Sequence, residues 1–208
     1  MRSTIRFLAA LLLCSSGPAL ADGPPHTLLA YGKVGGLIPV SKLGPHVSVR
    51  LGGGYIPPFL AGRLAAVVDL GYSQTSTGSS FTDPRVGDSG AEVSYTMTQR
   101  DLNLFIGPQY FILGPRHWIA PFAAVGLDLH FLQSVVQGDG GASGLGQNRE
   151  TSTKVGFAVR AGAGYRLGPG IITAEASFAW APIDHDITGE SHLGHIALLA
   201  GYTVILGL

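Results

Sequence analysis

The C-terminal segment of this 208-residue chain alternates between two kinds of side chain and ends without a polar tail. Along a β-strand, successive side chains point to opposite faces of the sheet. One face is apolar with a single tyrosine, and it consists of Leu198, Ala200, Tyr202, Val204, Leu206 and Leu208. The other face is smaller or neutral, and it consists of Leu199, Gly201, Thr203, Ile205 and Gly207. The pattern is typical of a strand that crosses a membrane with one face against lipid.

Residues 1–21 have the three parts of a secretory signal peptide. Arg2 and Arg6 form a basic start, an apolar run follows over 7–13, and Ala19-Leu20-Ala21 is a cleavage motif before Asp22. We expect export and cleavage, which leaves 22–208 as one domain. The alternative is a retained N-terminal helix.

The composition limits the classes of protein that the mature chain can belong to. Its one cysteine, Cys14, lies in the signal peptide and follows Leu13, which does not suit a lipoprotein site, so we expect no disulfide. Charged residues are 12% of the chain, about half the usual share. The mature chain has two more acidic than basic residues and no basic run, which argues against nucleic acid as a partner. It has no apolar stretch long enough for a transmembrane helix.

Alternating hydrophobicity predicts eight strands in the mature chain. Their approximate ranges are 28–39, 47–59, 63–74, 93–111, 118–136, 153–167, 171–183 and 194–208. The connections at 60–62, 112–117 and 168–170 are short and rich in Gly and Pro, as tight turns require. Those at 73–92, 137–152 and 184–193 are longer and polar, and the first, 40–46, is short. We expect 76–91 to be an exposed loop on the cell surface.

The faces of the predicted strands are well determined, because a shift of one residue would turn every charge toward lipid. In the segment 153–167, for example, Val155, Phe157 and Val159 alternate with Lys154 and Arg160. Aromatic side chains fall near strand ends, where the aromatic girdles of membrane barrels lie. They are Tyr55, Tyr72, Tyr110, Trp118, Tyr165, Trp180 and Tyr202.

The strand number, the unequal connections and the terminal strand resemble the small outer-membrane barrels of the OmpA, OmpX and OmpW kind. The resemblance covers nearly all of 22–208 and implies an eight-stranded antiparallel up-and-down transmembrane β-barrel in the outer membrane of a Gram-negative bacterium. It also implies surrounding outer-membrane lipids and lipopolysaccharide, and barrel-assembly machinery that engages the C-terminal strand. Leu208 departs from the terminal Phe or Trp usual in that family. We expect no attached peptidoglycan-binding domain, and the sequence names no ligand for the surface loops.

Ionisable side chains of both signs occupy the positions predicted to face the lumen. They are Lys33, Arg50, Asp69, Asp101, Asp128, His130, Lys154, Arg160, Arg166 and Glu175. Gln99, Asn103 and Gln109 share that face. Unpaired buried ions are costly, so we expect these groups to pair across the lumen. Arg160 and Glu175 are expected to share one charge network, because they lie on neighbouring strands joined by a turn near Pro169.

Eight strands enclose just enough space for side chains to fill. A polar plug is therefore expected, and the protein is predicted to be a structural or surface-interaction barrel rather than an enzyme. The first alternative is a small passive pore for ions or small solutes, or a ligand site, whose selectivity the lumen charges tune. The second is a lipid-modifying enzyme, because Asp128, His130 and Ser134 share one strand face, as do Glu175 and Ser177.

Potential metal ligands are densest where the last predicted loop joins its strands. Asp184, His185 and Asp186 are close in sequence to His192 and His195, and two histidines with two carboxylates suit a divalent ion. The spacing matches no specific metal site, however, and polar loops commonly carry His and Asp. We therefore expect no catalytic, cofactor or metal site, and leave metal binding by these loop residues as an open alternative.

Overall fold

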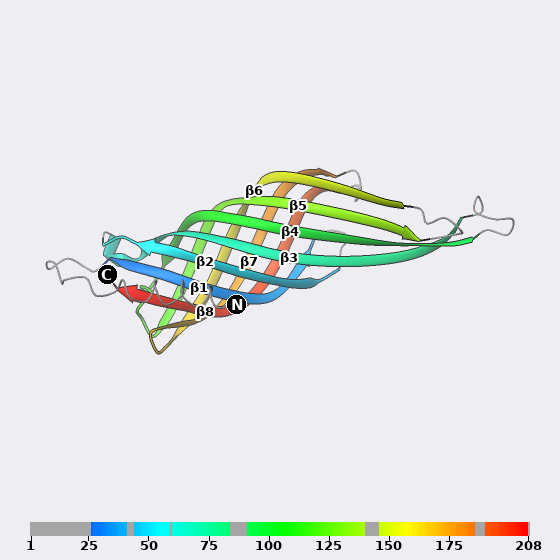
Figure 1. Ribbon diagram of the computed structural model, residues 1–208. Helices are drawn as coiled ribbons and strands as arrows, with labels where there is room; N and C mark the ends of the chain where they lie inside the picture. The colour runs from blue at the N-terminus through cyan, green and yellow to red at the C-terminus, as the bar shows by residue number, and fades with distance from the viewer. Residues whose placement is uncertain are drawn as a thin grey trace, which may run out of the picture.

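The computed structural model describes residues 26–40, 44–58, 60–83, 91–139, 146–185 and 190–207, and it shows a closed antiparallel barrel (Figure 1). The strands follow one another around the barrel in chain order. They are β1 (Thr27–Pro39), β2 (His46–Ile56), β3 (Leu64–Asp83), β4 (Ala91–Phe111), β5 (Ile119–Asp139), β6 (Gly146–Leu167), β7 (Gly170–His185) and β8 (Glu190–Gly207). The prediction of an eight-stranded antiparallel up-and-down barrel is confirmed.

Pairing between the first and the last strand closes the barrel. Thr27 lies opposite Gly207 at one end of this pair, and Pro39 lies opposite His195 at the other. The beginning of β1 and the end of β8 therefore lie at the same end as the three short connections, which we call the turn end. The opposite end, where the other connections lie, is the loop end.

The three short connections are built as the sequence predicts. The first contains a short 3₁₀ segment, η1 (Leu60–Gly62). Gly114 and Gly168, in the other two, have φ angles of 92° and 61°. Side chains disfavour that left-handed region, so glycine is the residue that lets these turns stay short.

The outer face of the barrel wall is apolar, and the charged side chains of the wall lie inside. On β5, Val125 and Leu127 are 53% and 58% exposed, whereas Asp128 and His130 are 1% and 0% exposed. The same inversion holds on β6, where Val159 is exposed and Arg160 is buried. The face assignment made from the alternation is therefore confirmed. No helix among the described residues has the length and apolar character of a membrane-spanning helix.

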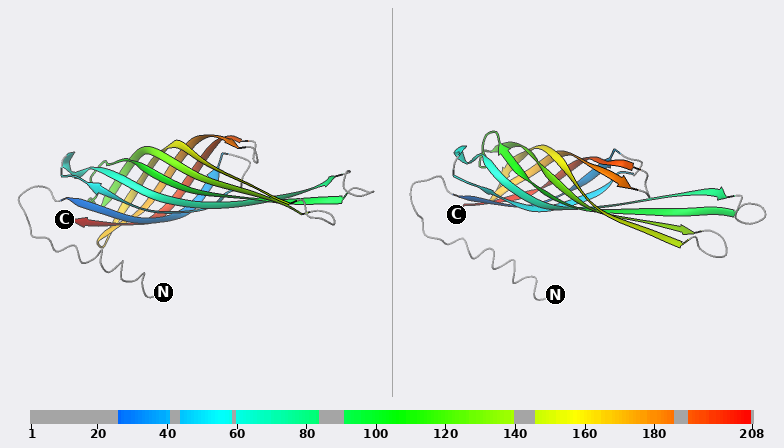
Figure 2. Two further views of the ribbon diagram at one scale, coloured as in Figure 1. Left: turned by 45° about the horizontal axis from the view of Figure 1, so that its top comes forward. Right: turned by 90° about the horizontal axis from the view of Figure 1, so that it is seen from above.

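At the loop end, β3, β4, β5 and β6 stay paired with one another beyond the barrel wall, as Figure 2 shows. Pairing of β3 with β2 reaches only Ser73, but β3 stays paired with β4 as far as Asp83. Pairing of β6 with β7 starts at Phe157, whereas β6 pairs with β5 from Gly146 onward. The result is a four-stranded projecting sheet made of 74–83, 91–100, 133–139 and 146–156.

The projecting sheet corrects two expectations about loops. Residues 76–83 and Ala91 were expected in a surface loop but are paired strand, and so are 137–139 and 146–152. The expected loop residues 84–90 lie outside the described residues. Most residues of these segments are polar, so the sequence there lacks the apolar alternation of a strand in the barrel wall. Their Thr-rich composition is nevertheless compatible with strands.

Inside the wall, glycines provide the space for two large aromatic side chains. A methyl group added to Gly162 would lie 2.6 Å from a ring carbon of Phe122, and one added to Gly126 would lie 2.7 Å from the ring of Phe105. Both phenylalanines are buried in the apolar cluster that fills part of the lumen. Small residues in one strand thus admit bulky residues from another, as a filled eight-stranded barrel requires.

Candidate functional site

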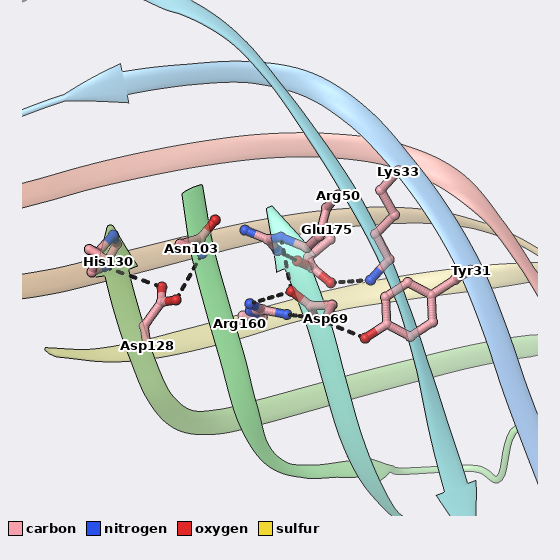
Figure 3. A network of polar contacts seen from close by, with 9 residues as sticks. All are labelled: Tyr31, Lys33, Arg50, Asp69, Asn103, Asp128, His130, Arg160 and Glu175. Carbon is pink, nitrogen blue, oxygen red and sulfur yellow. Dashed lines mark hydrogen bonds and ion pairs between the residues drawn. The ribbon is translucent and has the colours of Figure 1, made fainter. Parts of the chain in front are cut away.

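A network of ion pairs crosses the middle of the lumen (Figure 3). Glu175, on β7, is at its centre and pairs with two cations. Its Oε2 atom lies 2.5 Å from Nζ of Lys33 on β1, and its Oε1 atom lies 2.5 Å from Nη1 of Arg50 on β2. All three side chains are at most 4% exposed. One carboxylate therefore links three strands through the interior.

Asp69, on β3, is the second carboxylate of the network. Arg160, on β6, donates to it from both terminal nitrogens, at 2.5 and 3.2 Å. The phenol of Tyr31 donates to the same carboxylate at 2.9 Å, and Nε of Arg50 lies 3.5 Å from it. Arg50 thus connects the Asp69 and Glu175 groups into one network. The two-pronged contact of Arg160 is the stronger kind of arginine–carboxylate interaction.

Aromatic rings pack against the cations of this network. The guanidinium carbon of Arg160 lies 3.5 Å from the ring centroid of Phe105. Nζ of Lys33 lies 4.5 Å from the centroid of Tyr31 and 5.5 Å from that of Phe122. Desolvated cation–π contacts of this kind are favourable, and they also occupy the space around each charge. The charges and the rings together fill the cross-section of the barrel.

A second polar cluster, on β4 and β5, lies nearer the loop end. Asn103 donates to Asp128 at 2.8 Å, and Nδ1 of His130 lies 2.9 Å from Oδ2 of Asp101. The other ring nitrogen of His130 lies 3.6 Å from Asp128. The ring of His195, on β8, meets the His130 ring edge-on at 6.1 Å between centroids. Two carboxylates thus flank one buried imidazole.

This second cluster does not have the arrangement of a catalytic triad. A serine nucleophile needs its hydroxyl hydrogen-bonded to the histidine. Both ring nitrogens of His130 instead face carboxylates, and the buried hydroxyl of Ser134 has no hydrogen-bond partner among the described residues. The hydroxyl of Ser177 is likewise buried without a partner. The geometry gives no support to the lipid-modifying alternative.

The residues considered as metal ligands do not come together in the described part of the chain. No group of three or more His, Cys, Asp or Glu side chains among the described residues has metal-binding geometry. His195 is buried in the lumen, packed against His130. Asp186 lies outside the described residues, as do the side chains of Asp184 and His185.

Two small cavities lie on either side of the central network in the described part of the chain. One, of about 20 Å³, is lined by residues that include His46, Asp101 and His195. The other, of about 10 Å³, is lined by residues that include Lys33 and Phe122. A cavity needs roughly 10–15 Å³ by this measure to hold one water molecule. Each of these spaces therefore has room for about one water at most.

The structure brings together most, but not all, of the lumen residues expected from the sequence. The central network contains five of them, which are Lys33, Arg50, Asp69, Arg160 and Glu175. The second cluster contains three, which are Asp101, Asp128 and His130. Lys154 is half-buried on the inner face, opposite His130. Arg166 is exposed at the turn end, where it donates to the carbonyl of Arg116, so its expected place in the lumen network was wrong.

The expected link between Arg160 and Glu175 is indirect. Arg160 lies opposite Ser177, and Glu175 lies opposite Gly162, two residues farther along the same face. Arg160 pairs with Asp69 instead, and only Arg50 connects it to Glu175. Sequence reasoning did not single out Tyr31, although its inward parity with Lys33 was available as a signal.

Comparison with known proteins adds information about the fold only. No protein-family model and no curated protein matches the sequence. Among solved structures, the chain is similar to neisserial surface protein A, with 16% identity over 88% of this chain and 99% of that one, at a TM-score of 0.45. It is also similar to OprG of Pseudomonas aeruginosa, with 10% identity over 89% and 97% of the two chains, at a TM-score of 0.48. Ail of Yersinia pestis is also similar, with 15% identity over 88% of this chain and 99% of that one, at a TM-score of 0.38.

The fold is that of the small eight-stranded outer-membrane barrels. This statement rests on the strand order and the closing pair of β1 with β8 rather than on the similarity scores. The resemblance expected from the sequence is confirmed at that level.

Proposed function

We propose that this protein is an integral outer-membrane barrel with a closed lumen, which anchors the projecting sheet at the cell surface for interaction with other molecules. The central network of ion pairs is the observation that supports a closed lumen. Three cations, two carboxylates and the aromatic rings around them span the interior from β1 to β7. The cavities on either side hold about one water each.

The outer surface supports insertion in a membrane. Large apolar side chains on its wall are half exposed, among them Val68, Leu70, Ile106, Val125, Leu127, Val159 and Leu198. A water-soluble protein of this size would bury such a continuous apolar belt. Tyrosine and tryptophan side chains flank the belt, with Trp118 and Tyr165 near the turn end and Tyr72 and Trp180 toward the loop end. This is the girdle arrangement of transmembrane barrels.

The projecting sheet supports a role in surface interactions. Beyond the barrel wall its outer face is polar, with Gln74, Arg100 and Gln133 in one cross-strand row. The outer edges of β3 and β6 have no neighbouring strand among the described residues there. The parts of these β-hairpins that lie beyond the barrel wall present backbone and side-chain hydrogen-bonding groups away from the membrane.

Single-channel recording in a planar bilayer tests the closed lumen. We expect refolded protein to produce no current steps, because the charges that would have to move are held in ion pairs. The matched control is the double variant Asp69→Ala, Arg160→Ala, which removes both members of one pair and leaves space without an unpaired charge. This variant is expected to conduct. Regular current steps from the unaltered protein would instead favour the passive-pore alternative.

A further inference from the structure

The cavity on the turn-end side of the central network, which we call the inner pocket, has no carboxylate in its lining. Its volume is about 10 Å³, and β1, β4, β7 and β8 contribute polar side chains to it. The polar lining consists of Tyr31, Lys33, Gln109, Thr173 and Thr203. The apolar lining consists of Leu29, Phe111, Phe122 and Ile171. A pocket with one cation, several neutral donors and no acid suits an anion.

Lys33 brings its positive charge to the wall of the inner pocket. The ammonium group has three N–H donors, and Glu175 accepts from one of them at 2.5 Å. No other hydrogen bond of this group forms among the described residues. Nζ lies 4.5 Å from the ring centroid of Tyr31, as Figure 3 shows, and 5.5 Å from that of Phe122, and both rings line the pocket. Lys33 therefore has donors to spare beside this space.

A second donor at the inner pocket is a hydroxyl group without a partner. Thr173 is 2% exposed, and its Oγ1 atom has no hydrogen-bond partner among the described residues. The amide of Gln109 lines the same space and can also donate. The phenol of Tyr31 is already used, because it donates to Asp69. A buried polar group left without a partner is costly, so a ligand that accepts hydrogen bonds is favoured here.

The charge of the central network is unbalanced on this side of the lumen. Its three cations share two carboxylates, and Glu175 is divided between Lys33 and Arg50. The other two buried carboxylates of the described lumen flank His130, nearer the loop end. An uncompensated positive charge in the interior is costly. A negative ion beside Lys33 would therefore stabilise the network.

The inner pocket lies behind a positively charged mouth at the turn end. The described residues of this end include no acidic residue, but they include Arg63, Arg116 and Arg166. Arg116 and Arg166 line a larger space of about 220 Å³, which opens at the mouth of the barrel. Arg166 lies opposite Ile171, which lines the inner pocket, so the two spaces are neighbours. An opening lined by one sign of charge raises the local concentration of ions of the opposite sign.

We propose that the inner pocket binds one small halide ion, which is chloride in a biological medium, in contact with Lys33 and Thr173. Space for about one water-sized particle excludes phosphate, sulfate and organic anions. The ion accepts hydrogen bonds from the ammonium and hydroxyl groups and supplies the negative charge that the network lacks. It enters from the turn end and goes no farther, because the central network lies beyond it. This site is a property separate from the proposed surface function, and it needs no conduction through the barrel.

Bromide locates the site directly, because it is a halide close to chloride in size and scatters X-rays anomalously. Crystals of the refolded protein are grown in sodium bromide, and diffraction is measured at the bromine absorption edge. We expect an anomalous peak between Nζ of Lys33 and Oγ1 of Thr173. Density at that place without anomalous signal would identify a water molecule and overturn the proposal. Bromide found only beside Arg116 and Arg166 would be an adventitious ion, and it would overturn the proposal as well.

Urea unfolding in a neutral detergent measures the same site in solution. Sodium chloride replaces sodium gluconate at constant ionic strength, because gluconate is too large for the inner pocket. Binding to the folded state alone stabilises that state by mass action. Above the dissociation constant, a single site lowers the equilibrium constant for unfolding about tenfold for each tenfold rise in chloride. We expect this dependence in the unaltered protein.

Two substitutions and a matched control assign the chloride dependence to the inner pocket. Thr173→Val keeps the size of the side chain and removes its hydroxyl, and should raise the chloride concentration at half effect about tenfold, as for a hydrogen bond to a charged group. Lys33→Met removes the surplus charge and should abolish the dependence. Ser177→Ala removes another buried, unpartnered hydroxyl of β7, outside the pocket, and should leave the dependence unchanged.

Two results of the unfolding experiment would overturn the proposal. Absence of any chloride dependence in the unaltered protein would mean that no ion binds. An equal dependence in Thr173→Val and Ser177→Ala would mean that chloride acts as a general salt. If Lys33→Met fails to fold, the comparison of these two hydroxyl variants and the position of bromide decide the proposal.

Discussion

Replacing Glu175 by glutamine should destabilise the barrel strongly, because this carboxylate holds two buried cations. The nearest carboxylate oxygen to Nζ of Lys33 is Oε2 of Glu175, at 2.5 Å, and the two side chains are 3% and 1% exposed. Arg50 would keep Asp69 at 3.5 Å, but Lys33 has no second carboxylate partner among the described residues. The network already has three cations and two carboxylates. Removing one partner of a buried pair costs about 3–5 kcal/mol, and we expect a loss of that size.

A second substitution separates the ion pair from simple loss of packing. Lys33→Met in the Glu175→Gln protein removes the ammonium group that the first change leaves unpaired. The double variant should therefore recover about 2–3 kcal/mol relative to the sum of the single losses. Arg160→Met combined with Glu175→Gln should show a smaller coupling, because these two residues are linked only through Arg50.

Urea unfolding of the folded barrel in detergent, followed by tryptophan fluorescence, measures these free energies. Both tryptophans are on the outer surface, so their emission changes when the barrel leaves the micelle. A loss below about 1 kcal/mol for Glu175→Gln would refute the reasoning, since surface ion pairs are worth no more than that. Strictly additive losses of unfolding free energy for Lys33→Met and Glu175→Gln would also refute it, because the double-mutant cycle would then show no interaction energy between the two side chains.

Three further predictions follow from the wall and the projecting sheet. Val159→Arg should lower the free energy of unfolding by about 2–4 kcal/mol if this residue lies at the bilayer midplane, whereas Ala158→Arg should act by crowding the lumen. Urea unfolding in lipid vesicles compares the two variants. Tolerance of arginine at Val159 would contradict the assignment of faces. Gly162→Val should crowd both the backbone carbonyl of Ala174, 2.4 Å from an added methyl group, and the ring of Phe122. The expected loss of stability is about 1–3 kcal/mol, as for other overpacking changes, and thermal unfolding measures it. An epitope inserted near Gly87, between β3 and β4, should be detected on intact cells; detection only after permeabilisation would reverse the orientation.

The sequence predicts the barrel well because each strand in the wall has lipid on one face and the lumen on the other. That two-sided environment imposes an alternation that fixes the strands, and residues such as Val159 and Arg160 were placed on the correct faces. The same signal disappears where the strands leave the wall, since most residues of the projecting sheet are polar. For that reason the sequence predicts a loop over 76–83, where the structure has a strand.

Parity assigns a residue to a face but not to a depth, and this explains the errors in the lumen. Arg166 has inward parity, yet it is the last residue but one of β6 and is exposed. The partner of Arg160 could not be chosen from hairpin register either. Asp69 is three strands away around the barrel, and the two meet only because the closed cylinder brings opposite walls together. Contacts across the lumen depend on closure and stagger, which neighbouring-strand patterns do not encode.

The closing pair of β1 with β8 has a consequence for how the protein assembles. The other seven pairings join neighbours in the chain and can form as hairpins, but this one joins Thr27 to Gly207. Bringing the ends of a roughly 180-residue segment together costs about 5 kcal/mol of chain entropy. An open sheet in hydrocarbon would also leave the facing N–H and C=O groups of both edge strands without partners, at several kcal/mol each. Insertion and closure must therefore occur as one concerted step, and the rate of appearance of folded barrel should depend on the β1–β8 edge far more than on any hairpin.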